Sequence, residues 1–218
     1  MIRDGNAGIE AADGRASGEV ARHIARAAAR LFAEQGYDAT SVREIVEAAG
    51  VTKPTLYYHF GSKQGLGEAL LTRPMTEFLA TLRALFRDEP DPVRLLGRTI
   101  EAHLAFCRDE PDRARFFYAI CFGPSSTSLQ EEMHRFGEEM TRELVRCVVR
   151  LADAGLVEPG RVEACSEACR GLIIVSTLDS MFDGRELGPD LAARFVDDLL
   201  RGFAGPGHPF EGDRGRDS

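Results

Sequence analysis

Apolar residues recur every three or four positions along this chain, in segments separated by proline and glycine. The last segment shows the pattern clearly, since Leu191, Phe195, Leu199 and Phe203 repeat at intervals of four residues. This period is typical of helices with one buried face. No alternating run bounded by turns, which would indicate a strand, is found in the sequence. We therefore expect an all-α fold with about nine helices.

Polar caps, prolines and glycines delimit the expected helices. The N-cap candidates are Ser17, Ser41, Thr52 and Ser62, and Ser41 can form a capping box with Glu44. Helices are expected over 18–35, 42–49, 53–59, 63–86, 92–107, 111–122, 125–152, 159–182 and 189–203. Pro74 is expected to kink or split the fourth of them.

The negative charge of the chain lies in its C-terminal part. The net charge is −8, but residues 1–73 carry nine basic and nine acidic residues, so the whole imbalance falls in 74–218. A neutral region can bind nucleic acid when its cations gather on one face. Composition therefore permits a nucleic-acid partner without predicting one. The only lysines, Lys53 and Lys63, both lie in the neutral part.

Two short helices, 42–49 and 53–59, are joined by a tight turn at Gly50 and fit a helix-turn-helix. The apolar residues placed to pack against the first helix are Ile45, Val46, Val51 and Leu56. The second short helix is left to present hydroxyl, cationic and aromatic side chains. Such groups suit contacts with phosphates and with base edges in a major groove.

The run from Ala33 to Ile45, followed by the run from Ala49 to Lys63, resembles the N-terminal domain of the TetR family. The resemblance covers about residues 20–71 and agrees at many fixed positions. It implies three N-terminal helices for DNA, a variable helical ligand-binding domain, and a homodimer formed by the last two helices. Pro54 and the Gln64-Gly65 pair depart from the usual pattern. The second departure puts the family's hinge between the two domains in doubt.

The resemblance implies roles for individual residues of the second short helix and its flanks. Thr52 and Thr55 are implied to contact backbone or bases, Lys53 and Tyr57 to lie at the groove, and Tyr58, His59 and Lys63 to approach phosphates. Arg43 is a further candidate phosphate contact. Each has a structural alternative: Thr52 as a helix cap, Tyr57 and Tyr58 as packing residues, and Arg43 and His59 as solvated side chains.

The expected organisation has two domains between two disordered tails. The tails are 1–16 and 205–218, the helix-turn-helix domain is 17–62, and the ligand-binding and dimerisation domain is 63–204. Candidate ligand-binding residues are Phe106, Phe116, Phe117 and Ile120, with ordinary core packing as the alternative. The acidic body disfavours a strongly anionic ligand unless a local arginine overrules that inference. We therefore expect a small, mainly apolar ligand.

Candidate dimerisation residues are Cys169 and Leu172 on the penultimate helix and Phe195 and Leu199 on the last one. Two apolar helices from each protomer would form a four-helix bundle. The alternative is that these helices are buried within their own protomer.

The function expected from these features is a cytoplasmic transcriptional regulator that binds a palindromic operator as a homodimer, and the resemblance implies a repressor. No catalytic constellation is recognisable, so we expect neither an enzyme nor a cofactor. Two pairs, His103 with Cys107 and Cys165 with Cys169, each place two potential metal ligands on one helical face. A thiol or metal sensor, a ligand-independent DNA-binding dimer and an all-helical enzyme with a DNA-binding head therefore stay as alternatives.

Overall fold

The computed structural model describes residues 5–123, 128–188 and 190–201, and every regular element in these ranges is helical. The all-α prediction is confirmed. The helices are α1 (Gly5–Gln35), α2 (Val42–Ala48), α3 (Lys53–Phe60), α4 (Lys63–Leu70), α5 (Thr72–Asp88), α6 (Pro92–Asp109), α7 (Pro111–Phe122), α8 (Ser128–Asp153), the short 3-10 helix η1 (Pro159–Arg161), α9 (Val162–Asp183) and α10 (Leu191–Arg201). The expected tail 205–218 and the first four residues lie outside the described ranges.

The first helix is longer than expected. Helix α1 begins at Gly5, so Ser17 lies inside it and is not its N-cap. Residues 5–16 include four alanines and no proline, and alanine has the strongest helical preference of all residues. A good capping residue does not start a helix when the preceding sequence can continue it.

Helices α4 and α5 occupy the segment where one interrupted helix was expected. The break is at Leu71, three residues before Pro74. Pro74 is the third residue of α5, where a missing backbone N–H costs no helical hydrogen bond. The proline is therefore accommodated by starting a new helix just ahead of it, so the described ranges contain ten α-helices where nine were expected.

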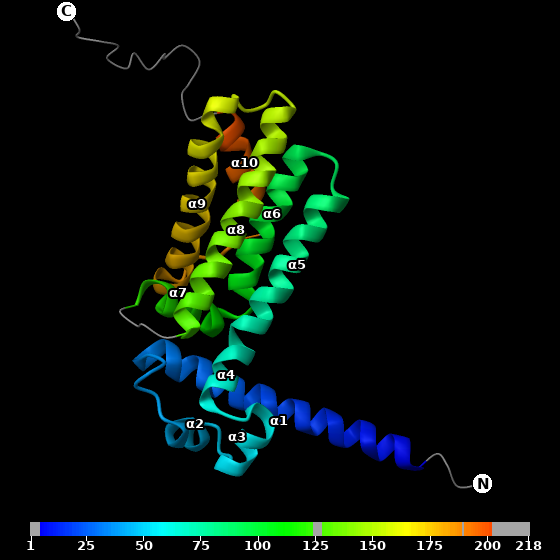
Figure 1. Ribbon diagram of the computed structural model, residues 1–218, viewed down its shortest axis with the longest axis vertical. Coiled ribbons are helices and arrows are strands. Elements are labelled where there is room, and N and C mark those ends of the chain that lie inside the picture. The colour runs from blue at the N-terminus through cyan, green and yellow to red at the C-terminus, as the bar shows by residue number, and fades with distance from the viewer. Residues whose placement is uncertain (1–4, 124–127, 189, 202–218) are drawn as a thin grey trace, which may run out of the picture.

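Helices α1 to α4 form a head whose core is continuous with part of the body. Ile24, Ala28 and Phe32 of α1 are buried against Ile45 of α2 and Leu56 of α3. The same core includes Phe116 and Ile120 of α7 and Met133 of α8. Figure 1 shows α1 lying across the base of the body, with α2 and α3 beneath it.

The body consists of the upright helices α5, α6, α8 and α9, with α7 at the lower end beside α1 (Figure 1). Helix α6 packs against α5, α8, α9 and α10, so it lies at the centre. Its buried residues Leu95, Leu96 and Ile100 share a core with Val148 of α8 and Val196 of α10. No helix in the described ranges combines the length and apolar character needed to cross a membrane.

Candidate functional site

Helices α2 and α3 each begin at a capping residue that the sequence predicted. The Ser41 hydroxyl accepts from the Glu44 amide, and the Glu44 carboxylate accepts from the Ser41 amide at 2.7 Å. Thr52 caps α3, with Pro54 in the first turn. Gly50 between the helices has φ of 59°, a left-handed conformation that glycine adopts without steric cost. These local contacts define where α2 and α3 begin and how the chain turns between them.

Helix α3 presents two adjacent tyrosines to solvent. Tyr58 is 80% exposed and Tyr57 is 46% exposed, whereas Leu56 beside them is fully buried. The hydroxyls of Thr52 and Thr55 lie 2.8 Å apart at the N-terminal end of the same helix. Lys53 is exposed there, and His59 is half-buried with its ring against that of Tyr58. The expected surface of hydroxyl, cationic and aromatic groups is therefore brought together on one short helix.

Two of the candidate phosphate contacts already have partners within the protein. The Lys63 ammonium donates to the carbonyl of Asp38 at 3.3 Å and lies 4.5 Å from the centre of the Tyr37 ring. Partial burial lowers the pKa of Lys63. Arg43 pairs with Glu47 at 2.7 Å on the exposed face of α2. Both cations therefore have a structural partner, unlike Lys53, for which no such contact is found among the described residues.

Gly65 explains one departure from the family pattern. A Cβ atom at this position would lie 2.1 Å from the carbonyl oxygen of Phe60, at the end of α3. No side chain fits at that distance, so the first turn of α4 can approach the end of α3 only because residue 65 is glycine. The Gln64-Gly65 pair is thus part of how this chain joins the two helices.

The head meets the body at a cluster of aromatic rings. Phe116 of α7 is fully buried, with its ring centre 4.9 Å from that of Phe32 and 6.1 Å from that of Tyr37. Ile120, one turn later, is buried in the same core. Phe116 and Ile120 therefore lie in the joint between head and body, and neither lines a cavity, contrary to the ligand-binding role expected for them.

The reason is the geometry of adjacent helical residues. Neighbouring side chains on a helix point about 100° apart, and on α7 this angle directs Phe116 to the core shared with the head and Phe117 away from it. Phe117 lies on the other side of α7 and does line a cavity. Phe106, the fourth candidate, packs half-buried against Phe78 at 4.7 Å and under the Arg113 guanidinium at 4.3 Å.

The cavity that Phe117 lines, named here the apolar cavity, lies among α6, α7, α8 and α9 and has a volume of about 650 Å³. Its apolar walls include Phe117, Met133, Met140, Leu144, Ile173 and Ile174. The expected wall on α7 is present, but α8 and α9 contribute more of the lining than α6 does. The sequence signal missed for α8 is Gly137 between Met133 and Met140 on one helical face, which leaves open space there.

Polar groups also reach the apolar cavity. Arg142, Glu138 and His134 come from α8, Arg170 from α9 and His103 from α6. The ring of His103 lies 2.8 Å, through Nδ1, from the carbonyl of Thr99, and burial lowers its pKa. Because a carbonyl only accepts, Nδ1 is the donor and Nε2 of this neutral ring is an acceptor.

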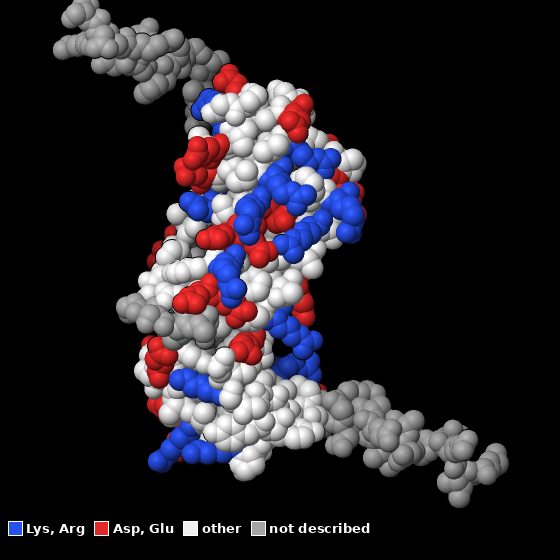
Figure 2. All heavy atoms as spheres, in the orientation of Figure 1, with Lys and Arg blue, Asp and Glu red and all other residues white. Residues whose placement is uncertain are grey.

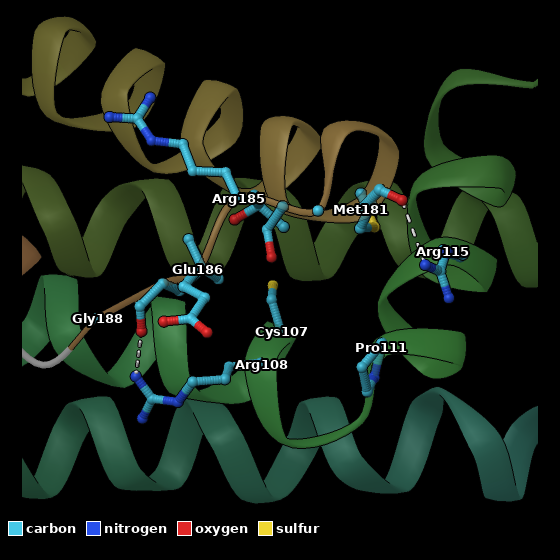
Figure 3. A pocket seen from close by; sticks show the side chains of 12 residues that line it. Cys107, Arg108, Pro111, Arg115, Met181, Arg185, Glu186 and Gly188 are labelled. Atoms are coloured by element: carbon cyan, nitrogen blue, oxygen red, sulfur yellow. Dashed lines mark hydrogen bonds between the residues drawn. The ribbon is translucent and has the colours of Figure 1, made fainter.

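A second cavity, named here the loop cavity, lies between α6, α7 and the loop that follows α9 (Figure 3). It has a volume of about 550 Å³, and Cys107, Thr177 and the arginines 108, 115 and 185 are among its lining residues. The Cys107 thiol points into it (Figure 3). The Thr177 hydroxyl beside it donates to the Ile173 carbonyl at 2.8 Å. Tyr118 of α7, in contrast, lines the apolar cavity.

The arginines of the loop cavity are engaged by the chain itself. Arg108 donates to the Leu187 carbonyl and to Glu101, Arg115 donates to the Met181 carbonyl and to Asp112, and Arg185 pairs with Asp179. Figure 3 shows the Arg185 guanidinium directed away from the cavity. These side chains therefore serve mainly to hold the loop after α9 against α6 and α7.

Helix α9 exposes an apolar stripe that is displaced around the helix from the expected residue Cys169. Val175 is 55% and Phe182 is 78% exposed, and they continue a line through Ala164, Ala168 and Gly171. Cys169 is fully buried within its own protomer, so the dimerisation role expected for it is wrong. Its face, shared with Ser166, Ile173 and Ser176, packs inward. Leu172, Phe195 and Leu199 are only partly buried.

Burial makes Cys107 and Cys121 poor candidates for thiol chemistry. It raises the pKa of the Cys107 thiol to about 11 and that of Cys121 to about 12. A thiol is reactive as its thiolate, which is scarce at neutral pH when the pKa is this high. No group of three or more potential metal ligands gathers in the part of the chain that the structure describes. A thiol or metal sensor therefore gains no support.

The charge pattern of the body surface also argues against a strongly basic face there. Basic and acidic side chains are intermixed over α5 and α8 (Figure 2). Arg83 pairs with Glu139 and Glu143, and Arg146 pairs with Glu143 at 2.6 Å. On the face shown, these body arginines are paired with acids, so the candidate nucleic-acid interface is assigned to the head.

Comparison with known proteins gives the clearest result for the head. Residues 24–70 match the family model described as bacterial regulatory proteins, tetR family. The HTH-type transcriptional regulator RutR of Escherichia coli (strain K12) is 36% identical over 94 residues, which cover 43% of this chain and 44% of RutR. The HTH-type transcriptional activator FasR of Mycolicibacterium smegmatis is 34% identical over 92 residues, 42% of each chain. The matches thus span less than half the length of these curated relatives.

The structural comparison extends the likeness to the body. The TetR family transcriptional regulator PfmR of Thermus thermophilus has a TM-score of 0.66 with this chain. The two are 24% identical, and the match covers 84% of this chain and 99% of PfmR. At this identity the likeness shows a common fold. Residues 24–70 of the head therefore match the TetR family model, and the chain as a whole shares its fold with PfmR.

Proposed function

We propose that the chain is a transcriptional repressor that binds a palindromic operator as a homodimer and is released by a ligand in the apolar cavity. The observation that carries this proposal is helix α3. An N-cap residue begins α3, and another begins α2 before it. Helix α3 exposes Tyr57 and Tyr58 beside Lys53. Large exposed aromatic side chains on a short, well-anchored helix are suited to a binding surface.

Within this proposal the residues of the head have different roles. Thr55 and Tyr57 contact base edges in the major groove, while Thr52 combines its role as N-cap with a phosphate contact. Lys53, Tyr58 and His59 approach the DNA backbone. Arg43 and Lys63 contact phosphate only if their present partners, Glu47 and the Asp38 carbonyl, are shared or released.

The proposed dimer uses the exposed stripe of α9. A short recognition helix reads too few base pairs to be specific alone, so two copies must enter major grooves about 34–36 Å apart. Small residues at Ala164, Ala168 and Gly171 allow the α9 helices of two protomers to pack closely, and Val175 and Phe182 supply apolar area. Helix α10 flanks α9 and would complete a four-helix interface.

Helix α7 offers a route from ligand to DNA. Phe117 faces the apolar cavity, while Phe116 and Ile120 on the same helix pack against the head. A ligand that shifts α7 therefore moves α1 relative to the body. If ligand binds best to a conformation in which the two α3 helices no longer match adjacent grooves, operator affinity falls.

The dimer and the DNA contacts can be tested together. An operator is selected from a randomised duplex library, and binding is measured by fluorescence anisotropy beside sedimentation of the free protein. We expect Val175→Asp to yield folded monomers that lose operator binding, because a charge is placed in the apolar stripe. Ala80→Asp puts the same charge on the exposed face of α5 and should change neither property.

A native chain that sediments as a monomer at micromolar concentration and binds operator one to one would refute the dimer. Unchanged operator affinity across a broad panel of compounds would instead favour a ligand-independent DNA-binding module. Transcription that rises with operator occupancy would assign the chain as an activator.

A further inference from the structure

The apolar cavity contains a charge feature that its apolar walls do not explain. Arg142 of α8 and Arg170 of α9 both line it, and neither has an ion pair or side-chain hydrogen bond within the described part of the chain. We propose that this cavity binds an amphiphile with an apolar body and an anionic end group, and that Arg142 and Arg170 bind that end group. The regulatory consequence rests on the function proposed above, but the binding does not.

The walls favour an apolar body of adaptable shape. Phe117 comes from α7, Ile173 and Ile174 from α9, and Met133 and Met140 from α8. Methionine side chains are flexible and adapt to ligands of irregular shape. A volume of about 650 Å³ lies in the usual range for sites that take small molecules. The cavity can therefore bury most of an elongated apolar chain.

The free state of Arg142 and Arg170 distinguishes them from the arginines of the other cavity. Arg108, Arg115 and Arg185 are each bonded to a carbonyl or a carboxylate of the chain. The loop cavity is richer in arginine, but those guanidiniums are already occupied. A guanidinium with free donors can form paired hydrogen bonds with a carboxylate or a phosphate.

The remaining polar groups of the cavity do not cancel the two arginines. Among the described residues Glu138 is the one carboxylate that lines it, so the side chains facing the ligand carry a net positive charge. His134 lies 3.3 Å from the carbonyl of Cys121, and the buried His103 is neutral. The acidic balance of the whole body therefore does not apply at this position, where local cations outnumber acids.

The test uses three amphiphiles with the same apolar chain and different end groups: decanoate, decanol and decyltrimethylammonium. Binding of each to the full chain is measured by isothermal titration calorimetry. We expect decanoate to bind about tenfold or more tighter than decanol, as one charge-assisted contact implies. Arg142→Gln and Arg170→Gln should each weaken decanoate binding by about tenfold and leave decanol binding unchanged.

Arg94→Gln is the matched control, because Arg94 is also exposed and has no ion pair with a described residue, but it does not line the cavity. It should leave the affinities for all three compounds unchanged. Equal affinity for decanoate and decanol, a preference for the cationic compound, or no binding of any of the three would overturn the inference. A preference for the cation would identify Glu138 as the selecting group.

Operator binding is measured separately, which keeps the two proposals distinguishable. If decanoate binds through the two arginines but does not alter operator affinity, the ligand class stands and ligand control of DNA binding fails. If the dimer binds operator but decanoate does not bind, the ligand class fails and the DNA-binding proposal stands.

Discussion

Helix α3 in the head and helix α7 in the body each carry two adjacent aromatic residues, and the two pairs are used differently. Tyr57 and Tyr58 both face solvent, because α3 is covered on one side only. Phe116 and Phe117 are divided between a core and a cavity, because α7 is covered on two sides by α1 and by α8. Two adjacent aromatic residues thus form an exposed surface on the outer helix α3, whereas on the inner helix α7 one ring packs in a core and the other lines a cavity.

The largest expected effect is on the free energy of unfolding and comes from the aromatic pair of α7. Phe116→Ala removes a fully buried ring and should lower the free energy of unfolding by about 3–5 kcal/mol. Phe117→Ala removes a ring that borders a cavity and should cost clearly less, while weakening ligand binding. Urea denaturation followed by circular dichroism measures both. Equal losses of unfolding free energy in the two variants would contradict the assignment of Phe116 to the core and Phe117 to the cavity.

A smaller effect is expected where α3 meets α4 within the head. Gly65→Ala forces α4 away from the Phe60 carbonyl and should destabilise the chain by about 1–3 kcal/mol. Gly18→Ala makes the same change on an exposed position of α1 with open space around it and should stabilise by about 0.5–1 kcal/mol. Thermal unfolding of the two variants should therefore shift in opposite directions. If both variants unfolded at a higher temperature than the native chain, α4 could move away from the end of α3 without loss of stability.

The two lysines sharpen the distinction between exposed and engaged side chains within the head. Lys53→Ala should reduce the slope of log affinity against log salt by about one unit, because one phosphate contact is lost. Lys63→Ala should leave the slope unchanged and lower thermal stability instead, because it loses the contacts with Tyr37 and Asp38. Anisotropy titrations across a salt series give both slopes. The reverse result would place Lys63 at the DNA.

The smallest expected effect is a pH dependence of the unfolding free energy, caused by His103 in the lining of the apolar cavity. Burial lowers the pKa of His103 below its ordinary value of 6.5 in the folded chain. The unfolded chain therefore takes up a proton first, so stability is full above pH 6.5 and decreases as pH falls toward the folded pKa. The difference in unfolding free energy between the native chain and His103→Gln should show this decrease. A difference that is constant between about pH 5 and 8 would contradict it.

Local signals in the sequence account for most of the head. The capping box at Ser41, the cap at Thr52 and the turn at Gly50 act within a few residues, so their geometry follows from the sequence alone. What could not be predicted there depends on distant groups. The Lys63 ammonium is directed to the Asp38 carbonyl, 25 residues earlier, and no local pattern indicates that contact.

The body was less predictable because its sites combine separate helices. The sequence identified apolar stripes, but the side of a helix that faces a partner depends on how neighbouring helices pack. Cys169 and Val175 both lie on apolar faces of α9, and only packing against α6 and α8 makes the first buried and the second exposed. The lining of the apolar cavity likewise required the positions of four helices.

The ring cluster of Phe32, Tyr37 and Phe116 bears on the exchange of heads between chains that share this fold. A chimera that joins another head to this body after Gly61 would replace Phe32 and Tyr37 but retain Phe116. The recombined chain would then have a large ring facing side chains of different size, which leaves either a void or an overlap. Functional hybrids are therefore restricted to heads that supply rings at both positions, or to bodies in which residue 116 is exchanged with them.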